Sequence, residues 1–203
     1  MSADRAHEPS RAEARRAQIR TAAAECFRQR GFHGTSIAEI SQAAGMSTGH
    51  IYHYFENKEA IIADIVAQDM ERTLAVTQAL RAAPDPKAAI VERAARGVQE
   101  VLDPSTAALQ IEIVAEAARN PHIAGIVRSA DAVWREHVLE TLRAVRQAGG
   151  DRDDDATLRG MVETIGAMFE GLRVRAIRNP DIDREAVMRL FRRIVDDLIT
   201  RSA

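Results

Sequence analysis

Four rings with polar tips lie close together in one short segment. His50, Tyr52, His53 and Tyr54 stand within five positions, and the two tyrosines are the only ones in the chain of 203 residues. A hydrophobic core favours Leu, Ile and Phe, because these side chains bury surface without a hydroxyl or a ring nitrogen that needs a partner. The segment is therefore predicted to form a surface that contacts another molecule.

Metal and catalytic chemistry fit these residues poorly. His50 and His53 are three positions apart on a predicted helix, but two imidazoles without a nearby Cys or carboxylate make an incomplete metal site. No glycine-rich phosphate loop is present, and no Ser, His and Asp arrangement has the helix-terminus or elbow context of a nucleophile. We therefore expect no enzyme activity, no catalytic residue, no metal and no cofactor.

A run of aspartates from Asp151 imitates the start of a calcium-binding loop, because Asp151, Asp153 and Asp155 are two positions apart. The sixth position of such a loop requires Gly and the twelfth requires Glu, but this chain has Ala156 and Val162 there. We interpret the run as a solvated loop whose last acids favour the N-terminus of the next helix.

Most segments of the chain have apolar residues at helical spacing, and no convincing alternation typical of strands is found. Helices are predicted over residues 10–30, 36–43, 57–81, 87–101, 105–119, 121–148 and 154–178, with one short helix opened by Ser47 and a last one after Pro180. Ser and Asn at the starts, and Gly or Pro at the ends, mark these boundaries. The predicted fold is all-α with about nine helices.

The second and third helices have the layout of a helix-turn-helix. Ile37 and Ile40 line one face of the second helix, and Ile51 and Phe55 line one face of the third. Packing of these faces on the first helix turns Gly49 and His53 outward, with His50 and Tyr52 on the flanks. This outward face is the one that a DNA major groove would meet.

The side chains on this face divide into two expected roles. Ser47, Thr48 and His50 are short donors and acceptors at the N-terminal end of the helix, which suits contact with base edges. Tyr52, Tyr54 and Lys58 suit contacts that hold phosphates on either side. Gly49 removes a side chain where the helix would come closest to DNA.

Charge and composition favour two domains. Residues 1–60 carry eight Arg or Lys and seven Asp or Glu, whereas the rest of the chain carries twenty and twenty-three. The positive bias concentrates in six arginines between Ser10 and His33, namely Arg11, Arg15, Arg16, Arg20, Arg28 and Arg30. We predict a flexible N-terminal arm over 1–10, a helix-turn-helix domain over 11–60 and a second domain over 61–203.

Residues 35–62 resemble the DNA-binding segment of the TetR family of bacterial transcriptional regulators. The resemblance rests on Ala44-Gly45, Ser47, the stretch Ile51-Tyr52-His53-Tyr54-Phe55, and Asn57-Lys58-Glu59. It implies that Tyr52, Tyr54 and Lys58 hold phosphates and that Thr48, Gly49 and His50 sit at base edges. It also implies that Thr35 or Ser36 bonds the DNA backbone from the second helix, whereas Ala38 departs from the fullest contact pattern of the family.

Residues 112–142 are similar to the C-terminal domain of BetI-type regulators in this family, which implies one small-molecule pocket per subunit. The residues expected near that pocket are Glu112, Glu116, Trp134, His137, Met168 and Phe169. A carboxylate beside rings would suit a cationic ligand. The alternative is a solvated acidic edge beside a core tryptophan, and we favour it because Glu is seldom fully buried unless it is paired.

The last two helices are the most apolar and are predicted to form a dimer interface. The apolar band of residues 154–178 covers more than half of the helix circumference, so it needs cover on two sides, and a second copy would supply one of them. The residues expected at this interface are Leu158, Met161, Ile165, Val187, Leu190, Phe191, Ile194 and Leu198.

The sequence therefore predicts a dimeric repressor whose partners are double-stranded operator DNA, a second copy of itself and a small-molecule effector of unknown identity. No run approaches the roughly 18 apolar residues that span a bilayer, so no membrane partner is expected and a cytoplasmic location is predicted. Two alternatives remain at this point. One is a dimeric DNA-binding regulator without an effector, and the other is an enzyme with an incidental helical domain.

Overall fold

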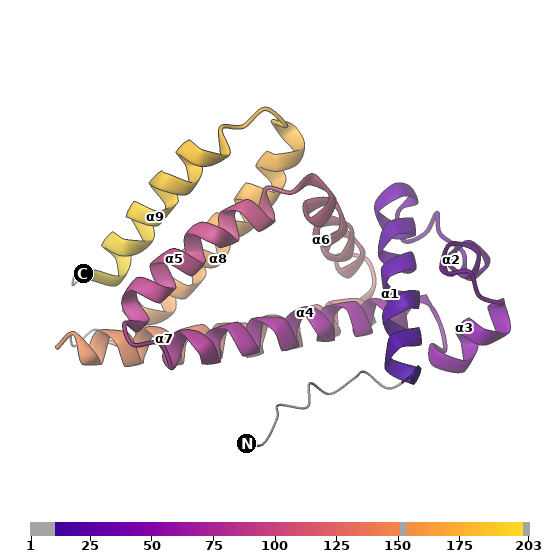
Figure 1. The fold of residues 1–203 in the computed structure, drawn as a ribbon, viewed down its shortest axis with the longest axis horizontal. Coiled ribbons are helices and arrows are strands. Elements are labelled where there is room, and N and C mark those ends of the chain that lie inside the picture. Colours follow the sequence, from indigo (N-terminus) through magenta and orange to yellow (C-terminus); the bar gives the residue numbers. More distant parts are fainter. Residues whose placement is uncertain (1–10, 151–153, 201–203) are drawn as a thin grey trace, which may run out of the picture. The chain divides into compact units, whose positions relative to one another are not determined.

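The computed structural model describes residues 11–150 and 154–200, which are helical and contain no strand (Figure 1). Its nine helices are α1 (Arg11–Arg30), α2 (Ile37–Ala44), α3 (Thr48–Tyr54), α4 (Lys58–Arg81), α5 (Pro86–Val101), α6 (Pro104–Ala117), α7 (Pro121–Ala148), α8 (Asp155–Arg178) and α9 (Arg184–Thr200). The all-α prediction is confirmed. The predicted arm over residues 1–10, Asp151 and Asp153 lie outside the described residues.

The chain divides into two compact units, Met1–Ile65 and Val66–Ala203. The division falls inside α4, so this helix begins in the first unit and ends in the second. The boundary predicted at residue 60 also falls in α4.

The first unit is built on the apolar face of α1. Phe27 is 1% exposed, and its ring lies 5.5 Å from that of Phe32 between the ring centroids. Ile40 of α2 and Ile51 of α3 are fully buried, as the spacing of apolar residues predicted. Because α2 and α3 each bury one face in this core, their opposite faces remain available to other molecules.

Helices in the second unit begin at capping residues followed by proline. Asp85, Asp103 and Asn120 are the N-caps of α5, α6 and α7, and Pro stands within the first turn of each. Proline suits that position because its missing N–H would have no partner there. At Asp103, hydrogen bonds from the Ser105 and Thr106 side chains hold the pKa of the carboxyl below its usual range.

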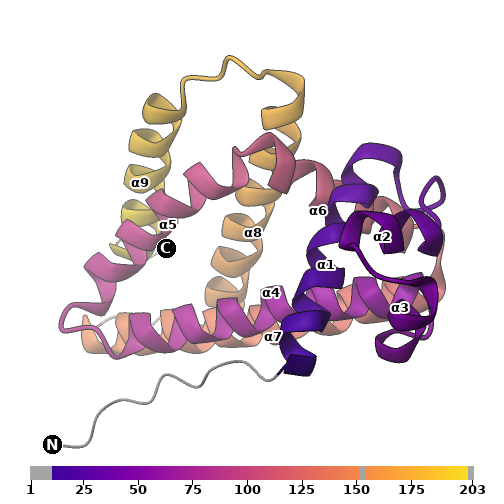
Figure 2. The same ribbon diagram turned by 45° about the vertical axis from the view of Figure 1, so that its right-hand side comes forward.

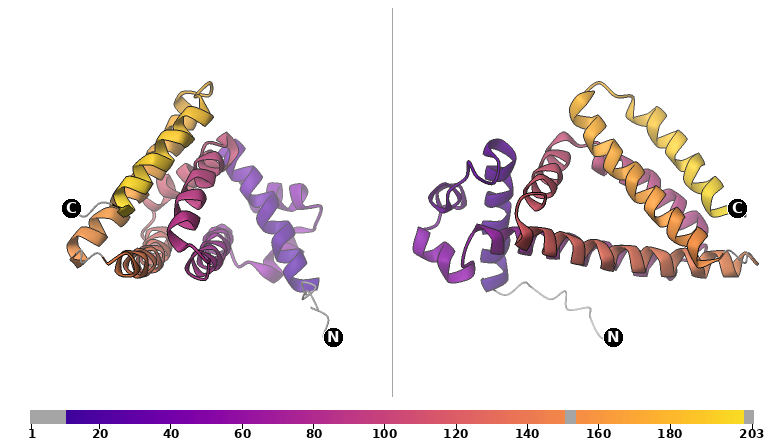
Figure 3. Two further views of the ribbon diagram at one scale, coloured as in Figure 1. Left: turned by 60° about the vertical axis from the view of Figure 1, so that its left-hand side comes forward. Right: turned by 180° about the vertical axis from the view of Figure 1, so that it is seen from behind.

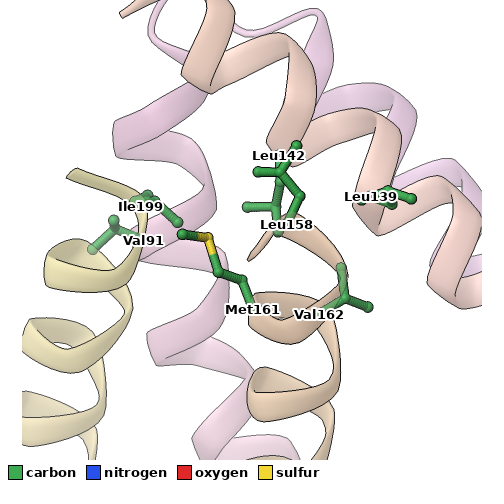
Figure 4. Close-up of a cluster of buried hydrophobic side chains, with 7 residues drawn as sticks. All are labelled: Val91, Leu139, Leu142, Leu158, Met161, Val162 and Ile199. Atoms are coloured by element: carbon green, nitrogen blue, oxygen red, sulfur yellow. The ribbon is translucent and has the colours of Figure 1, made fainter. Parts of the chain in front are cut away.

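The second unit has two apolar clusters. α5 packs against both α8 and α9 and crosses between them in Figure 2. One cluster joins α5, α7, α8 and α9 (Figure 4) and contains Val91, Leu139, Leu142, Leu158, Met161, Val162 and Ile199. The other, from α5, α6, α8 and α9, contains Ala94, Val98, Leu102, Ala107, Ala176, Phe191 and Val195. The two clusters pack α8 and α9 against α5. The sides of α8 and α9 that face away from α5 take no part in either cluster.

Candidate nucleic-acid interface

The connection between α2 and α3 is fixed by three local contacts. Gly45 ends α2 with a φ of 62°, in the left-handed region that favours glycine, and its N–H donates to carbonyls of the last turn. The Ser41 hydroxyl donates to the Met46 carbonyl. The Ser47 side chain then caps α3 by accepting a hydrogen bond from the His50 N–H at 3.2 Å. These contacts set the direction in which α3 starts.

The outward face of α3 is open to solvent. Thr48, Gly49, His50 and His53 are exposed, and Tyr52 is 54% exposed, a large value for an aromatic side chain. A Cβ atom added at Gly49 would have no atom of this chain within 4 Å, apart from the backbone of its own helix and its chain neighbours. Nothing in the described fold therefore requires a glycine there, although glycine costs roughly 1 kcal/mol inside a helix relative to alanine.

Three of the four polar rings form a cluster. The Tyr54 ring centroid lies 5.4 Å from that of His50 and 5.0 Å from that of His53, and the two imidazoles are 6.5 Å apart. Tyr54 is half-buried whereas both histidines are exposed. The phenol ring therefore supports the two imidazoles from the protein side, a contact that the sequence did not predict.

Of the two residues expected to bond DNA from α2, one is unavailable. Thr35 is 1% exposed, and its hydroxyl is shared between the carbonyls of Cys26 at 3.1 Å and Gly31 at 2.8 Å. The expected contact at Thr35 is therefore corrected, because the hydroxyl is used inside the protein. Ser36 is exposed and caps α2 in a reciprocal pair of hydrogen bonds with Glu39, so it remains the candidate at this end of α2.

Lys58 makes contacts within the first unit that the sequence does not predict. Its Nζ donates to the carbonyls of Phe32 and Thr35, each at 2.6 Å, and lies 4.4 Å from the centroid of the Phe32 ring. The ammonium thus points back into the turn between α1 and α2. The phosphate contact expected for Lys58 stays a prediction, and the structure adds that its side chain folds inward onto these carbonyls.

Two arginines of α1 are held by one carboxylate of α4. Arg16 and Arg20 donate to opposite oxygens of Asp64 at 2.8 and 2.6 Å, and the Asp64 side chain is 17% exposed. The Arg16 guanidinium also lies 4.6 Å from the centroid of the Phe55 ring. These contacts fasten the first turns of α4 to α1 within the first unit.

Two further arginines are paired with acids. Arg28 pairs with Glu25, and Arg30 pairs with Glu39. Hydrogen bonds from Arg28 and Gln29 lower the pKa of the exposed Glu25 carboxyl. Four of the six arginines in the cluster are therefore paired with three carboxylates in the first unit, so the cluster carries less of the argument for DNA binding than the open face of α3 does.

Comparison with known proteins agrees with the helix-turn-helix geometry. Residues 19–65 match the model for bacterial regulatory proteins of the tetR family, and residues 89–200, more than half of the chain, match the model for the C-terminal part of BetI-type transcriptional repressors. This chain belongs to the TetR family. It is a transcriptional regulator and not an enzyme.

Relatives support this membership along most of the chain. The HTH-type transcriptional regulator UidR of Escherichia coli K12 is 33% identical over 136 residues, which are 66% of this chain and 67% of UidR. The structure of GusR from Salmonella enterica has a TM-score of 0.75 with 26% identity, covering 98% of this chain and 100% of that one. FadR of Bacillus subtilis, solved with stearoyl-CoA, shares the fold, with a TM-score of 0.74, 19% identity and coverage of 88% and 96%.

Three of the residues expected near a ligand pack against the two apolar clusters of the second unit. Trp134 packs against the cluster drawn in Figure 4, and a Cβ added at Gly166 would lie 3.2 Å from its ring. Met168 and Phe169 pack against the other apolar cluster, and the Phe169 ring centroid is 4.7 Å from that of Phe191. These rings have packing roles in the described residues, and their contact with a ligand stays a prediction.

The two glutamates expected near the ligand differ in burial. Glu112 is half-buried, whereas Glu116 is 2% exposed. The solvated edge that we favoured is therefore wrong for Glu116, which lies 3.6 Å from Arg119 and accepts a long hydrogen bond of 3.4 Å from Asn120. These partners place Glu116 at the turn between α6 and α7. The His137 ring nitrogen bonds the Val133 carbonyl at 3.0 Å.

A cavity of about 620 Å³ opens elsewhere in the second unit. Its walls come from the end of α4, the start of α5, the end of α7 and the end of α9, and they include Arg81, Lys87, Val145 and Ile199. None of the six expected ligand residues is among the described residues that line it. The position of a ligand site therefore remains a prediction.

A polar contact joins three helices of the second unit. Gln110 of α6 donates to Asp69 of α4 at 2.9 Å. On α8, burial lowers the pKa of the Arg173 guanidinium, while the charges of Glu170 and Asp69 act in the opposite direction. No sequence pattern predicts this group, because its members are far apart along the chain.

The expected dimer residues divide by burial. Leu158, Met161 and Ile165 are 3–7% exposed inside the chain's own core, and Phe191 is 3% exposed, so their expected place at an interface is corrected. Each points toward helices of the same chain. Leu190 is 57% exposed and Ile194 is 44% exposed, whereas Val187 and Leu198 are half-buried. The outward apolar face of α9 is therefore centred on Leu190 and Ile194.

The outward side of α8 carries a different set of residues. Five exposed positions follow one another at spacings of four and three, and none has a side chain larger than valine: Gly160, Thr164, Ala167, Gly171 and Val174. Cβ atoms added at Gly160 and Gly171 would meet nothing within 4 Å outside the backbone of their own helix and their chain neighbours. Seen from behind, α8 lies in front of α5 and α9 runs beside α8 (Figure 3). The sequence analysis missed this stripe because small side chains give a weak hydrophobic signal, although the spacing itself is visible.

Among the described residues, no helix combines the length and the apolar character that a membrane span requires. The same residues contain no group of three or more His, Cys, Asp or Glu placed to hold a metal ion.

Proposed function

We propose that the protein is a homodimeric repressor that binds operator DNA through α3 of each copy and leaves it when a small molecule binds the second unit. The observation that carries the dimer is the outward face of α8 and α9. Val174, Ile177, Leu190 and Ile194 are each 44–57% exposed, and a monomer would leave these apolar side chains in water. A second copy of the same face would cover them about a two-fold axis.

The stripe of small residues on α8 supports close approach of the partner. Spacings of four and three keep one line of residues on the same side of a helix, as in coiled coils. Without bulky side chains along that line, two α8 helices approach more closely than the usual 8–10 Å between axes. Leu190 and Ile194 of α9 would then pack beside this contact and complete a four-helix bundle.

The roles proposed on DNA follow the exposed face of α3. Ser47, Thr48 and His50 stand at its N-terminal end and would meet base edges, and Gly49 would allow the backbone to come close. Tyr52 and Ser36 would hold phosphates on the two sides. Tyr54 and His53 would act together with His50, because the three rings are in contact. A repressor that works on operator DNA acts in the cytoplasm of a bacterium.

Release by a small molecule is supported by what the second unit contains beyond a dimer face. Residues 89–200 match the model for the C-terminal part of BetI-type transcriptional repressors. FadR of Bacillus subtilis, which shares the fold, was solved in complex with stearoyl-CoA. α4 carries Asp69 in the second unit and Asp64 in the first, so a ligand that displaces α4 would act on a helix fastened to α1. Glu112, Trp134, His137, Met168 and Phe169 remain the proposed surroundings of the ligand.

One experiment tests the DNA-binding part of the proposal. Selection of bound fragments from random DNA should yield a palindrome, with half-sites separated by one helical turn, ~34–36 Å, or somewhat more. Sedimentation at micromolar protein should show a dimer. Selection of an asymmetric single site would contradict the proposal. So would a protein that sediments as a monomer and still binds the selected DNA tightly.

A second experiment separates the effector-responsive repressor from its alternative. A broad metabolite and drug panel is screened for compounds that raise the melting temperature and release the selected DNA, with stearoyl-CoA included because of FadR. If no compound does either, the dimeric regulator without an effector is the better description.

A further inference from the structure

We propose that the small molecule bound by the second unit is an amphipathic carboxylic acid and that Arg173 of α8 holds its carboxylate. This inference rests on the proposed function, because it names the chemical class of the ligand. Glu112 and Glu116 suggested a cationic ligand in the sequence, but Glu116 is engaged by Arg119 and Asn120. The structure points instead to an anion.

The guanidinium of Arg173 has no acceptor within the described residues. Its Nε is sealed from solvent and has no hydrogen bond, and the side chain forms no ion pair with these residues. All other described arginines that are buried or half-buried donate to an oxygen of this chain. A buried donor without an acceptor costs free energy, so an acceptor from outside the chain would stabilise this group.

Two nearby carboxylates do not supply that acceptor. Asp69 and Glu170 favour the charged form of the guanidinium, but burial still lowers the pKa of Arg173, because desolvation outweighs their attraction. Asp69 is engaged by Gln110, which donates to it at 2.9 Å, and by Arg72 at 3.4 Å. The Glu170 side chain is exposed. The positive charge of Arg173 is therefore only partly compensated within the chain.

The outer end of the guanidinium is open to a ligand. Nε is the one nitrogen of Arg173 that is both buried and without a partner in the described residues, so Nη1 and Nη2 keep contact with solvent. A carboxylate can accept from both nitrogens at once, because its two oxygens match the planar fork. A doubly charged phosphate would meet stronger repulsion from Asp69 and Glu170 than a singly charged carboxylate does. A carboxylate is therefore the better match.

An aromatic ring lies two helical turns from Arg173. Gly166 precedes Arg173 by seven residues, so it lies on the same side of α8, about 10 Å away along the helix axis. A Cβ added at Gly166 would lie 3.2 Å from the ring of Trp134, which is half-buried and therefore partly accessible. A ligand whose carboxylate is held by Arg173 would bring an apolar body within reach of this ring.

The first test uses the full-length protein without DNA and two matched series of probes. One series is decanoate, decanol and decylamine, and the other is benzoate, benzyl alcohol and benzylamine. Each series keeps the apolar body and changes the charge. In at least one series, calorimetric titration should show that the acid binds about ten-fold or more tightly than its alcohol and its amine. If the acid has no such advantage in either series, the proposal is overturned.

Variants identify the residue that holds the carboxylate. Arg173→Met removes the guanidinium but keeps a long side chain, so it should weaken binding of the acid by about ten-fold or more and leave the alcohol unchanged. Arg173→Lys keeps the charge without the planar fork and should recover only part of the loss. Arg175→Met is the control for the loss of one positive charge, because Arg175 is exposed on the same helix, and it should bind the acid as the wild type does.

A purely structural role of Arg173 would give a different pattern. Arg173→Met should keep or raise the melting temperature of the ligand-free protein, because it removes a half-buried charge that has no ion pair. Asp69→Asn should tighten binding of the acid several-fold, because it removes a repulsive charge and keeps an oxygen that accepts from Gln110. A lower melting temperature of Arg173→Met together with unchanged binding of the acid would overturn the proposal.

Release of the selected DNA is measured separately, so this inference and the proposed function can fail independently. If the acid binds through Arg173 but leaves the DNA bound, the carboxylate site stands and the release step of the proposed function fails. If a compound without a carboxylate releases the DNA from the wild type and from Arg173→Met alike, the proposed function stands and the carboxylic acid is the wrong ligand class.

Discussion

The α2–α3 region and the α8–α9 region bury and expose opposite kinds of side chain. Around α2 and α3, charged groups that look available in the sequence are used inside the protein, as with Lys58, Arg16 and Arg20. Around α8 and α9, apolar groups such as Leu190 and Ile194 remain outside. The first region is closed by its own polar contacts and keeps polar rings for a partner, whereas the second leaves an apolar face open.

The difference indicates the kind of partner that each region fits. A polar polymer such as DNA exchanges water for hydrogen bonds, so its protein partner needs exposed donors and acceptors on a rigid support. A second copy of a helix pair exchanges water for apolar contact, so it needs a smooth apolar face. Four experiments test this contrast, in order of decreasing expected effect.

The largest effect should come from placing charge on the open apolar face. Leu190→Asp combined with Ile194→Asp should give monomers and lower operator affinity by about 100-fold or more, because linked recognition helices bind with an effective concentration that single ones lack. Sedimentation and titration of the selected DNA measure the two effects.

Phe191→Asp is the contrasting variant for this face. Phe191 is 3% exposed, and its ring centroid lies 4.7 Å from that of Phe169, so the charge would enter the core and unfold the second unit. If the Leu190 and Ile194 double variant unfolds as readily as Phe191→Asp, the face is not open in the way described.

The next effect tests the closed region. Asp64→Ala would leave Arg16 and Arg20 without the carboxylate that both contact, and we expect the free energy of unfolding of the first unit to fall by about 2–3 kcal/mol, less than for a fully buried pair. The change in free energy of unfolding is measured by urea titration, with amide hydrogen exchange in α1 as the readout of the first unit. Glu56→Ala, at an exposed position just before α4, serves as the control for the loss of one carboxylate. Equal stability of Asp64→Ala and the wild type would mean that solvent already screens this contact.

A smaller effect should appear on the rings of α3. His50→Ala should reduce discrimination between operator variants by ~1–3 kcal/mol while leaving binding to random DNA nearly unchanged. Binding arrays with single-base changes measure this discrimination. Equal losses on every sequence would assign His50 to the DNA backbone.

Gly49→Ala should raise the melting temperature, because alanine favours a helix and the added methyl group meets nothing in this chain outside its own helix backbone and chain neighbours. The same methyl group should weaken DNA binding, because it would stand where the helix comes closest to DNA.

The smallest effect is expected at a helix cap remote from both faces. Asp103→Ala should cost about 1 kcal/mol of stability at neutral pH. Hydrogen bonds lower the pKa of Asp103 in the folded protein, so its contribution is complete above the unfolded pKa of about 3.9 and is lost as pH falls through the lower folded pKa. Thermal unfolding of both proteins from pH 7 to pH 3 measures this, and a difference that grows on acidification would contradict it.

Sequence patterns predicted the parts of this fold that depend on local chemistry. Gly45 and Ser47 mark the turn before α3 because their backbone and capping preferences are strong, and Ile40 and Ile51 are buried where helical spacing places them. The order and approximate limits of the helices followed from such signals.

The sequence did not predict where long or widely apolar groups would point. Lys58 has a flexible stem that reaches a carbonyl 26 residues away as readily as it reaches solvent, and no local pattern distinguishes the two. On α8, an apolar band wider than half the helix leaves open which side faces the chain's own core. The pattern therefore predicts Met161 at the dimer interface, whereas Met161 lies in the chain's own core.

The packing of Trp134 on Gly166 gives the protein an intrinsic optical reporter. Trp134 is the only tryptophan in the chain, and a Cβ added at Gly166 would lie 3.2 Å from its ring, so the ring sits against the backbone of α8. Indole emission depends on the polarity and quenching groups around the ring. A change in the contact between α7 and α8 would therefore shift the fluorescence of the unlabelled protein, and rearrangements of the second unit would be visible in real time without an attached dye.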